Sequence, residues 1–105
     1  MKDIETIKKE LKQVKYYYAM FALFANQKNT RIIPPESVVN MVNDYGHRIF
    51  SAPIRLRIAY DNLYRLCKRQ KDYAQECGVT DKYIQILHKR IINFFYDSFN
   101  KEQKQ

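Results

Sequence analysis

The first 25 residues carry an apolar seam whose members are alternately three and four residues apart. Because that spacing returns to one side of an α-helix, the seam predicts a single long helix from about Ile4 to Asn26. Polar residues fill the other side of its first half. The stretch "YYYAMFALFA" in its second half is apolar nearly all round, so we expect that half to be buried on several sides. The seam consists of Ile4, Ile7, Leu11, Val14, Tyr18, Phe21 and Ala25.

Helix signals continue along the chain, and no segment alternates apolar and polar residues as a strand would. The segment "NQKNTRIIPP" is predicted to be a loop, and Pro35 with Glu36 favours a helix start there. That helix either ends at Gly46 or contains it. Ser51, as a capping hydroxyl, and Pro53 mark the start of the next helix. Its expected apolar face is Ile54, Ile58, Leu63, Leu66 and Cys67. The predicted fold class is all-α, with about five helices.

The net charge of +8 is unevenly distributed. Residues 1–46 carry seven Lys or Arg against five Asp or Glu, a net of +2, whereas residues 47–105 carry twelve against six, a net of +6. A basic surface attracts polyanions, and nucleic acid is the commonest polyanion of the cytosol. The excess surrounds the segment "QKDYAQECGVTDKYIQILHKR", which therefore becomes the candidate functional region.

Three residues of that segment have the spacing of a helix-turn-helix. Ala74 is the small residue where two helices cross, Gly78 is the turn, and Ile84 closes the core between them. Thr80 can cap the second helix, which we expect from Asp81 to about residue 98. The alternative is an ordinary helical hairpin that does not touch DNA. The full predicted core of the motif is Tyr73, Ala74, Cys77, Gly78, Val79, Ile84 and Leu87.

If the motif reads DNA, the roles of its outward residues follow from their positions. Gln85 suits adenine, Lys82 suits guanine, and Ile86 suits a thymine methyl group in the major groove. The predicted base-reading residues are Thr80, Lys82, Gln85, Ile86 and Lys89. The predicted phosphate contacts are Lys68, Arg69, Lys71 and Arg90, with Lys89 also suited to that role. For each basic residue the alternative is a solvated surface charge.

The stretch "LYRLCKRQKDYAQECGVTDKYIQILHKRIINFF" resembles helix-turn-helix domains of the sigma-70 region 4 type. It is particularly similar to small phage and prophage regulators of the autolysin-regulator and late-gene-activator kind. The resemblance covers about 35 residues, and it implies binding of double-stranded DNA in transcription control, with RNA polymerase or another host protein as a further partner. It rests on Leu63-Tyr64, Gln70, Ala74, Gly78, the run Lys82-Tyr83-Ile84-Gln85, and Lys89-Arg90. The opening "IKKELKQVKYYYA" is also similar to the first helix of some of these proteins.

A chain of 105 residues fits one small domain. We expect residues 1–50 to form a helical scaffold or dimerisation part, 51–100 the helix-turn-helix part, and 101–105 a frayed tail. A homodimer is expected because helix-turn-helix proteins commonly read two half-sites. The alternative is that the same apolar residues form the core of the monomer, which covers most of them but leaves some aromatic surface. The dimerisation candidates are Ile4, Ile7, Leu11, Val14, Tyr18, Phe21, Phe94, Phe95 and Phe99.

A second hypothesis is a protein-interaction module, such as a phage-encoded inhibitor of a host protein, that uses the aromatic-rich "KYYYAMFALF" and "NFFYDSF". No motif supports an enzyme, so we predict none, and no cofactor or metal. Cys67 and Cys77 are expected to be free thiols buried as small apolar groups, and His88 a surface or half-buried polar residue. No run approaches a membrane span of about 20 residues, and the charged start lacks a signal core, so we expect a cytoplasmic location, in a bacterial host if the protein is phage-encoded.

Overall fold

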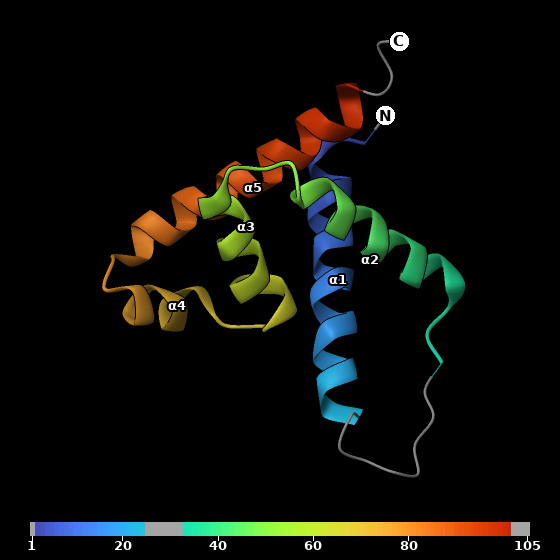
Figure 1. Ribbon diagram of the computed structural model, residues 1–105, viewed down its shortest axis with the longest axis horizontal. Helices are drawn as coiled ribbons and strands as arrows, with labels where there is room; N and C mark the ends of the chain where they lie inside the picture. Colours follow the sequence, from blue (N-terminus) through green and yellow to red (C-terminus); the bar gives the residue numbers. More distant parts are fainter. Residues whose placement is uncertain (1, 25–32, 102–105) are drawn as a thin grey trace.

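The computed structural model describes residues 2–24 and 33–101, and this part of the chain is all-α, as predicted (Figure 1). The predicted ends of the first helix at Ala25 and Asn26, and residues 102–105 of the expected tail, lie outside it. Lys101 still belongs to the last helix. The elements are α1 (Ile4–Phe24), α2 (Glu36–Ile49), α3 (Ile54–Tyr60), the π-helical turn η1 (Asp61–Arg65), α4 (Gln70–Cys77) and α5 (Asp81–Lys101).

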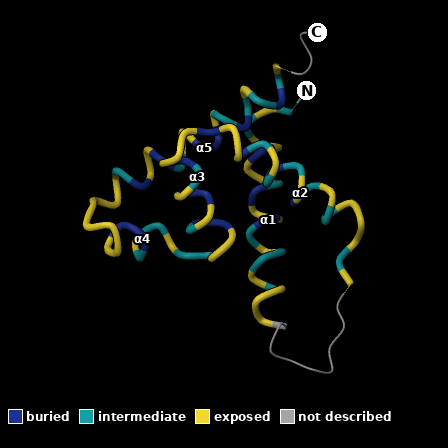
Figure 2. Tube along the Cα trace, viewed as in Figure 1, coloured by how far each residue is buried: buried dark blue, intermediate teal, exposed yellow. Residues whose placement is uncertain are grey.

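α1 passes through the middle of the molecule, where its first half packs against α2, η1 and α5 (Figure 1). α3 lies against α5, η1 lies against α1 and α3, and α4 joins α5 through a turn at the far end. Figure 2 shows the buried positions where these helices meet, while the second half of α1 is mostly exposed. One continuous cluster of buried side chains contains residues of every element.

The second half of α1 differs from its prediction. The side chains of Tyr16, Phe21 and Leu23 are 66%, 67% and 61% exposed, although this half was expected to be buried on several sides. The reason is positional, because α1 continues beyond the helices that cover its first half (Figure 1). An apolar sequence can show that a surface favours burial, but it does not supply the neighbour that covers it.

The dimerisation candidates also need correction. Five of them are buried within the monomer core, so they are unavailable to a second chain: Ile7, Leu11, Val14, Phe95 and Phe99. Phe95 packs edge-on against Tyr45 of α2 at a ring separation of 4.8 Å, which uses its apolar surface inside one chain. Ile4, Tyr18 and Phe94 are half-buried against the same core, and Phe21 alone of the nine is exposed.

α2 begins at Glu36 as predicted, and Gly46 lies inside it. Ser51 does not cap α3, since its hydroxyl donates to the Arg48 carbonyl at 2.9 Å and Pro53 directly precedes the helix. The predicted apolar face of this region is largely wrong, because Ile54, Ile58 and Leu66 are exposed and Cys67 is half-buried. The buried face instead contains two tyrosines, whose rings remove more apolar area from water. It consists of Leu56, Ala59, Tyr60, Leu63 and Tyr64.

Candidate nucleic-acid interface

The turn between α4 and α5 is centred on Gly78, as predicted. Gly78 has a φ of 68°, a left-handed conformation that side chains other than glycine resist. Its N–H donates to the Gln75 carbonyl at 3.2 Å, and the Val79 N–H donates to the Ala74 carbonyl at 3.0 Å. This pair of hydrogen bonds is the Schellman arrangement that ends many helices. It stops α4 abruptly and directs the chain into α5.

Four of the predicted core residues of the motif lie between α4 and the rest of the molecule. Tyr73, Ala74, Ile84 and Leu87 are all buried, and Ala74 and Ile84 are each 1% exposed. A small side chain at Ala74 lets the two helices approach each other closely. We call residues 70–101 the α4–α5 unit; its order of helix, turn and helix is the predicted one.

Cys77 and Val79 do not belong to this core, contrary to the prediction, because both are exposed. They flank Gly78 directly on either side in the turn between α4 and α5. Both cysteines are free thiols, as expected, but only Cys67 is half-buried. Cys77 is the last residue of α4, one turn after the buried Tyr73, and its side chain stays exposed there.

The start of α5 orients its outward face. The Thr80 side-chain oxygen accepts a hydrogen bond from the Tyr83 N–H at 3.1 Å, so Thr80 caps the helix as predicted. The remaining base-reading candidates follow at helical spacing, and all are exposed on one face: Lys82, Gln85, Ile86 and Lys89. The structure therefore brings these four side chains together beside the capping hydroxyl.

The predicted phosphate contacts fall into two groups. Lys71 and Arg90 are exposed, and neither forms an ion pair within residues 2–24 and 33–101. Lys68 instead pairs with Glu76 at 2.7 Å, and Arg69 pairs with Asp72 at 2.9 Å. Ion pairs at the surface contribute about 0–1 kcal/mol each, although Lys68 is half-buried and also donates to Asn62 Oδ1 at 2.8 Å. A phosphate can therefore replace the carboxylate partner at small cost.

Sequence reasoning missed a basic cavity beside α5. It is an open hollow with a volume of about 170 Å³, lined by residues of α1, η1, α4, α5 and the loop between η1 and α4. Lys12 and Lys15 of α1, Lys68, Gln70 and His88 supply its polar wall, and Leu63 and Tyr64 its apolar wall. The visible signal was the row Lys8, Lys12 and Lys15, spaced by four and three residues, but the sequence did not show which helix that row faces.

The loop that closes the cavity is held against α1 by Cys67. The Cys67 thiol shares its one S–H hydrogen between the carbonyls of Lys15 and Tyr64, at 3.4 Å and 3.3 Å from Sγ. Cys67 itself has a positive φ of 56°, which turns the chain sharply between η1 and α4. The turn carries Lys68 and Gln70 to the same place as the α1 lysines.

His88 is half-buried, as expected, and its ring contacts the Tyr64 hydroxyl. Burial lowers the pKa of His88, and the positive charges of Lys15 and Lys8 lower it further. Burial raises the pKa of Tyr64, so its hydroxyl remains protonated at neutral pH. We therefore assign the proton to the tyrosine oxygen, which donates to Nε2 of a neutral imidazole.

No protein-family model, curated protein or solved structure matches this chain. None of the described helices has both the length and the apolar character needed to cross a membrane. Across the described ranges, no three His, Cys, Asp or Glu side chains gather as a metal-binding group.

Proposed function

We propose that this protein binds double-stranded DNA sequence-specifically and regulates transcription for a phage or mobile element, in the cytoplasm of a bacterial host. The observation that carries the proposal is the exposed face of α5, where Lys82, Gln85 and Ile86 project together from a helix set at a fixed angle by the Gly78 turn. The likeness of the sequence to sigma-70 region 4 domains supports the same conclusion.

The chemistry of this face suits the major groove. The amide of Gln85 can accept from and donate to one adenine, while the ammonium groups of Lys82 and Lys89 can donate to guanine. Ile86 is 43% exposed, an apolar side chain in the right place for a thymine methyl group. The Thr80 hydroxyl, although it caps α5, retains a hydrogen to donate.

Backbone contacts come from the flanks of the unit. Lys71 near the start of α4 and Arg90 on α5 have no carboxylate partner among the described residues, so both can bind phosphates. Lys68 and Arg69 can also bind phosphates if each exchanges its carboxylate partner for one. Such contacts fix position and supply affinity without reading sequence. Specificity then depends on the α5 face.

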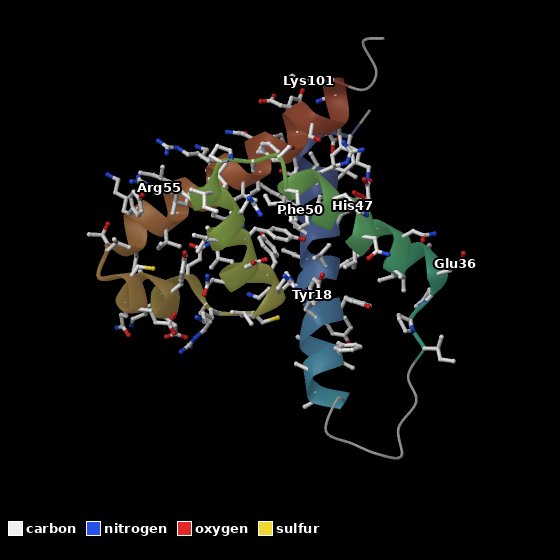
Figure 3. All side chains as sticks on the ribbon, in the orientation of Figure 1. Tyr18, Glu36, His47, Phe50, Arg55 and Lys101 are labelled. Atoms are coloured by element: carbon white, nitrogen blue, oxygen red, sulfur yellow. The ribbon has the colours of Figure 1, made fainter. Side chains whose placement is uncertain are left out.

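The same function favours a homodimer, because a pair of α5 helices reads two half-sites. With five of the candidate residues buried in the core, we infer that the contact uses the second half of α1. Phe21 is exposed there and stacks on Tyr17 of the preceding turn, and Tyr18, labelled in Figure 3, lies one turn before Phe21 on the same side of the helix. An exposed aromatic side chain on the uncovered part of a helix is typical of an interaction surface.

The test compares the affinity of variants for the preferred duplex and for an unrelated duplex by fluorescence anisotropy. Gln85→Ala is expected to lose about 1–3 kcal/mol on the preferred duplex, and little on the unrelated one, because only base contacts disappear. Gln13→Ala is the matched control, since Gln13 is an exposed glutamine on α1. Equal affinities of Gln85→Ala and wild type for the preferred duplex would refute the proposed reading face.

A second candidate function is a protein-interaction module that inhibits a host protein. The exposed Tyr16, Phe21 and Leu23 favour it, because aromatic and large apolar residues are typical of binding surfaces. RNA polymerase or another host protein would then be the partner. This function requires no binding to DNA, so the absence of DNA binding in the same assay would favour it over the first.

A further inference from the structure

The basic cavity beside α5 is not used by the proposed base-reading face. It contains Lys12 and Lys15 from α1, and neither forms an ion pair with any residue that the structure describes. No carboxylate is among the described residues that line it. Two uncompensated ammonium groups at one concave site attract an anion, and low-dielectric walls strengthen that field.

The other lining groups are also donors. Lys68 also lines the cavity, and its ammonium group pairs with Glu76 and donates to Asn62 Oδ1 at 2.8 Å. Gln70 is the first residue of α4, a helix that begins without a side-chain cap, so its first N–H groups can face an anion. His88 contributes a ring whose pKa is lowered by burial first, and then by the charges of Lys15 and Lys8, so it stays neutral. Donors from three separate segments of the chain therefore meet here.

We propose that this cavity binds a phosphate group, held by Lys12, Lys15, Lys68 and Gln70. The volume of about 170 Å³ is sufficient for a single tetrahedral oxyanion and leaves its remaining substituent outside. His88 lies one helical turn from Gln85 on α5, so the cavity flanks the base-reading face. The phosphate therefore comes from the DNA backbone next to the site read by α5, a part of the inference that rests on the proposed function.

This arrangement gives α1 a role that its sequence did not suggest. The helix that supplies the core through Ile7, Leu11 and Val14 also presents lysines to the ligand from its neighbouring face. A cation held on a packed helix loses less freedom on binding than one on a loop. The contact would thus fix the orientation of α5 relative to the duplex.

The first experiment tests the cavity without DNA. Sodium sulfate, at constant ionic strength, is titrated into the full chain while the ring resonances of the two histidines are followed by NMR. We expect a saturable shift of His88, with no such shift of His47, which is exposed on α2. The shift should disappear in Lys12→Gln and in Lys12→Gln/Lys15→Gln, and persist in Lys9→Gln, an exposed α1 lysine outside the cavity. Equal responses in all four proteins would overturn the site.

The second experiment decides the source of the phosphate. The affinity of the same proteins for duplex DNA is measured against salt concentration, with circular dichroism to establish that each is folded. Loss of one phosphate contact should lower affinity on the order of tenfold and make the log–log salt slope shallower by about 0.9, without changing sequence preference. A different result would overturn the DNA source: Lys12→Gln/Lys15→Gln loses the sulfate response but binds DNA with the affinity and salt slope of wild type. The site would then be assigned to a free phosphorylated molecule.

These two experiments separate the inference from the function it builds on. If wild type binds no DNA, the proposed function fails, and the sulfate titration still decides the cavity. If wild type binds DNA but no sulfate response occurs at His88, the cavity fails and the α5 face is unaffected. Lys12→Gln is the safer variant for folding because Lys12 is exposed, whereas Lys15 is half-buried.

Discussion

The hydroxyl of Tyr64 in η1 contacts the imidazole of His88 in α5, and this contact joins two segments that are 24 residues apart. Their rings are stacked with an interplanar angle of 23° and centroids 5.8 Å apart. The contact ties α5 to the π-helical turn, while Lys15 and Lys8 keep the surroundings positive. Burial, and after it these two positive charges, lowers the pKa of His88. The imidazole is therefore neutral in the folded protein at a pH where it begins to gain a proton in the unfolded chain.

That difference predicts a dependence of stability on pH. The folded pKa of His88 is lowered below the unfolded value of about 6.5, so the unfolded chain binds more protons as the pH falls. The contribution of His88 to stability is present above about pH 6.5 and is lost as the pH falls through the folded pKa. Urea unfolding measured from about pH 7.5 to about pH 5.5 should show a falling free energy of unfolding.

Variants at the two histidines show which residue causes this dependence of stability on pH. His88→Gln should flatten the pH dependence in that interval, because Gln does not titrate, whereas His47→Gln should keep it. His47 is exposed on α2 and provides the matched substitution. A slope that survives His88→Gln unchanged would show that another group causes it.

The two glycines are predicted to respond in opposite directions to the same substitution. Gly78→Ala should destabilise the protein by about 1 kcal/mol, because alanine resists the φ of 68° at the turn. Gly46→Ala should stabilise it by about 0.5–1 kcal/mol, because Gly46 lies inside α2 and alanine favours helix. A new Cβ meets nothing within 4 Å at either position, so backbone conformation decides both results.

Chemical denaturation of the two variants beside wild type measures this difference. Gly78→Asn should lie between wild type and Gly78→Ala, since asparagine tolerates the left-handed region better than alanine. A stabilising Gly78→Ala would mean that the turn does not hold its left-handed conformation in solution.

The inferred dimer predicts that substitution of exposed Phe21 changes the oligomeric state and that substitution of exposed Phe50 does not. Phe21→Glu should shift the protein toward monomer, because a charge would have to be buried in the contact between two α1 helices. Phe50→Glu should leave the distribution unchanged, although Phe50 is similarly exposed at 69%; it lies between α2 and α3, away from the end of α1 (Figure 3). Sedimentation velocity over a range of concentrations measures both, and a wild type that stays monomeric throughout would contradict the dimer.

The features that sequence predicted correctly have local causes. Ile7, Leu11 and Val14 of the seam form a buried helix face, and the left-handed Gly78 and the Thr80 cap depend on residues only a few positions away. Turn and cap chemistry is determined within one or two turns of chain. The order of helix, turn and helix in the α4–α5 unit was therefore accessible without a structure.

The incorrect predictions concern what each helix packs against. The spacing of apolar residues could not show that Phe95 packs against Tyr45. Phe95, a core residue, was therefore predicted to lie in a dimer contact. It favoured the isoleucines Ile54 and Ile58 over a tyrosine-containing face of the same helix. The row of lysines on α1 was readable, but the cavity that it forms with His88 arises only when α1 and α5 are placed together.

The central claim is that the exposed face of α5 reads a DNA sequence, and selection of bound fragments from a random-sequence pool tests it most directly. At ~150 mM salt, purely electrostatic binding is weakened, so retained fragments report base contacts. The account predicts enrichment of one motif, arranged as an inverted repeat with half-sites about 10 base pairs apart or a multiple of that distance. Retention without an enriched sequence, or no retention at all, would contradict it.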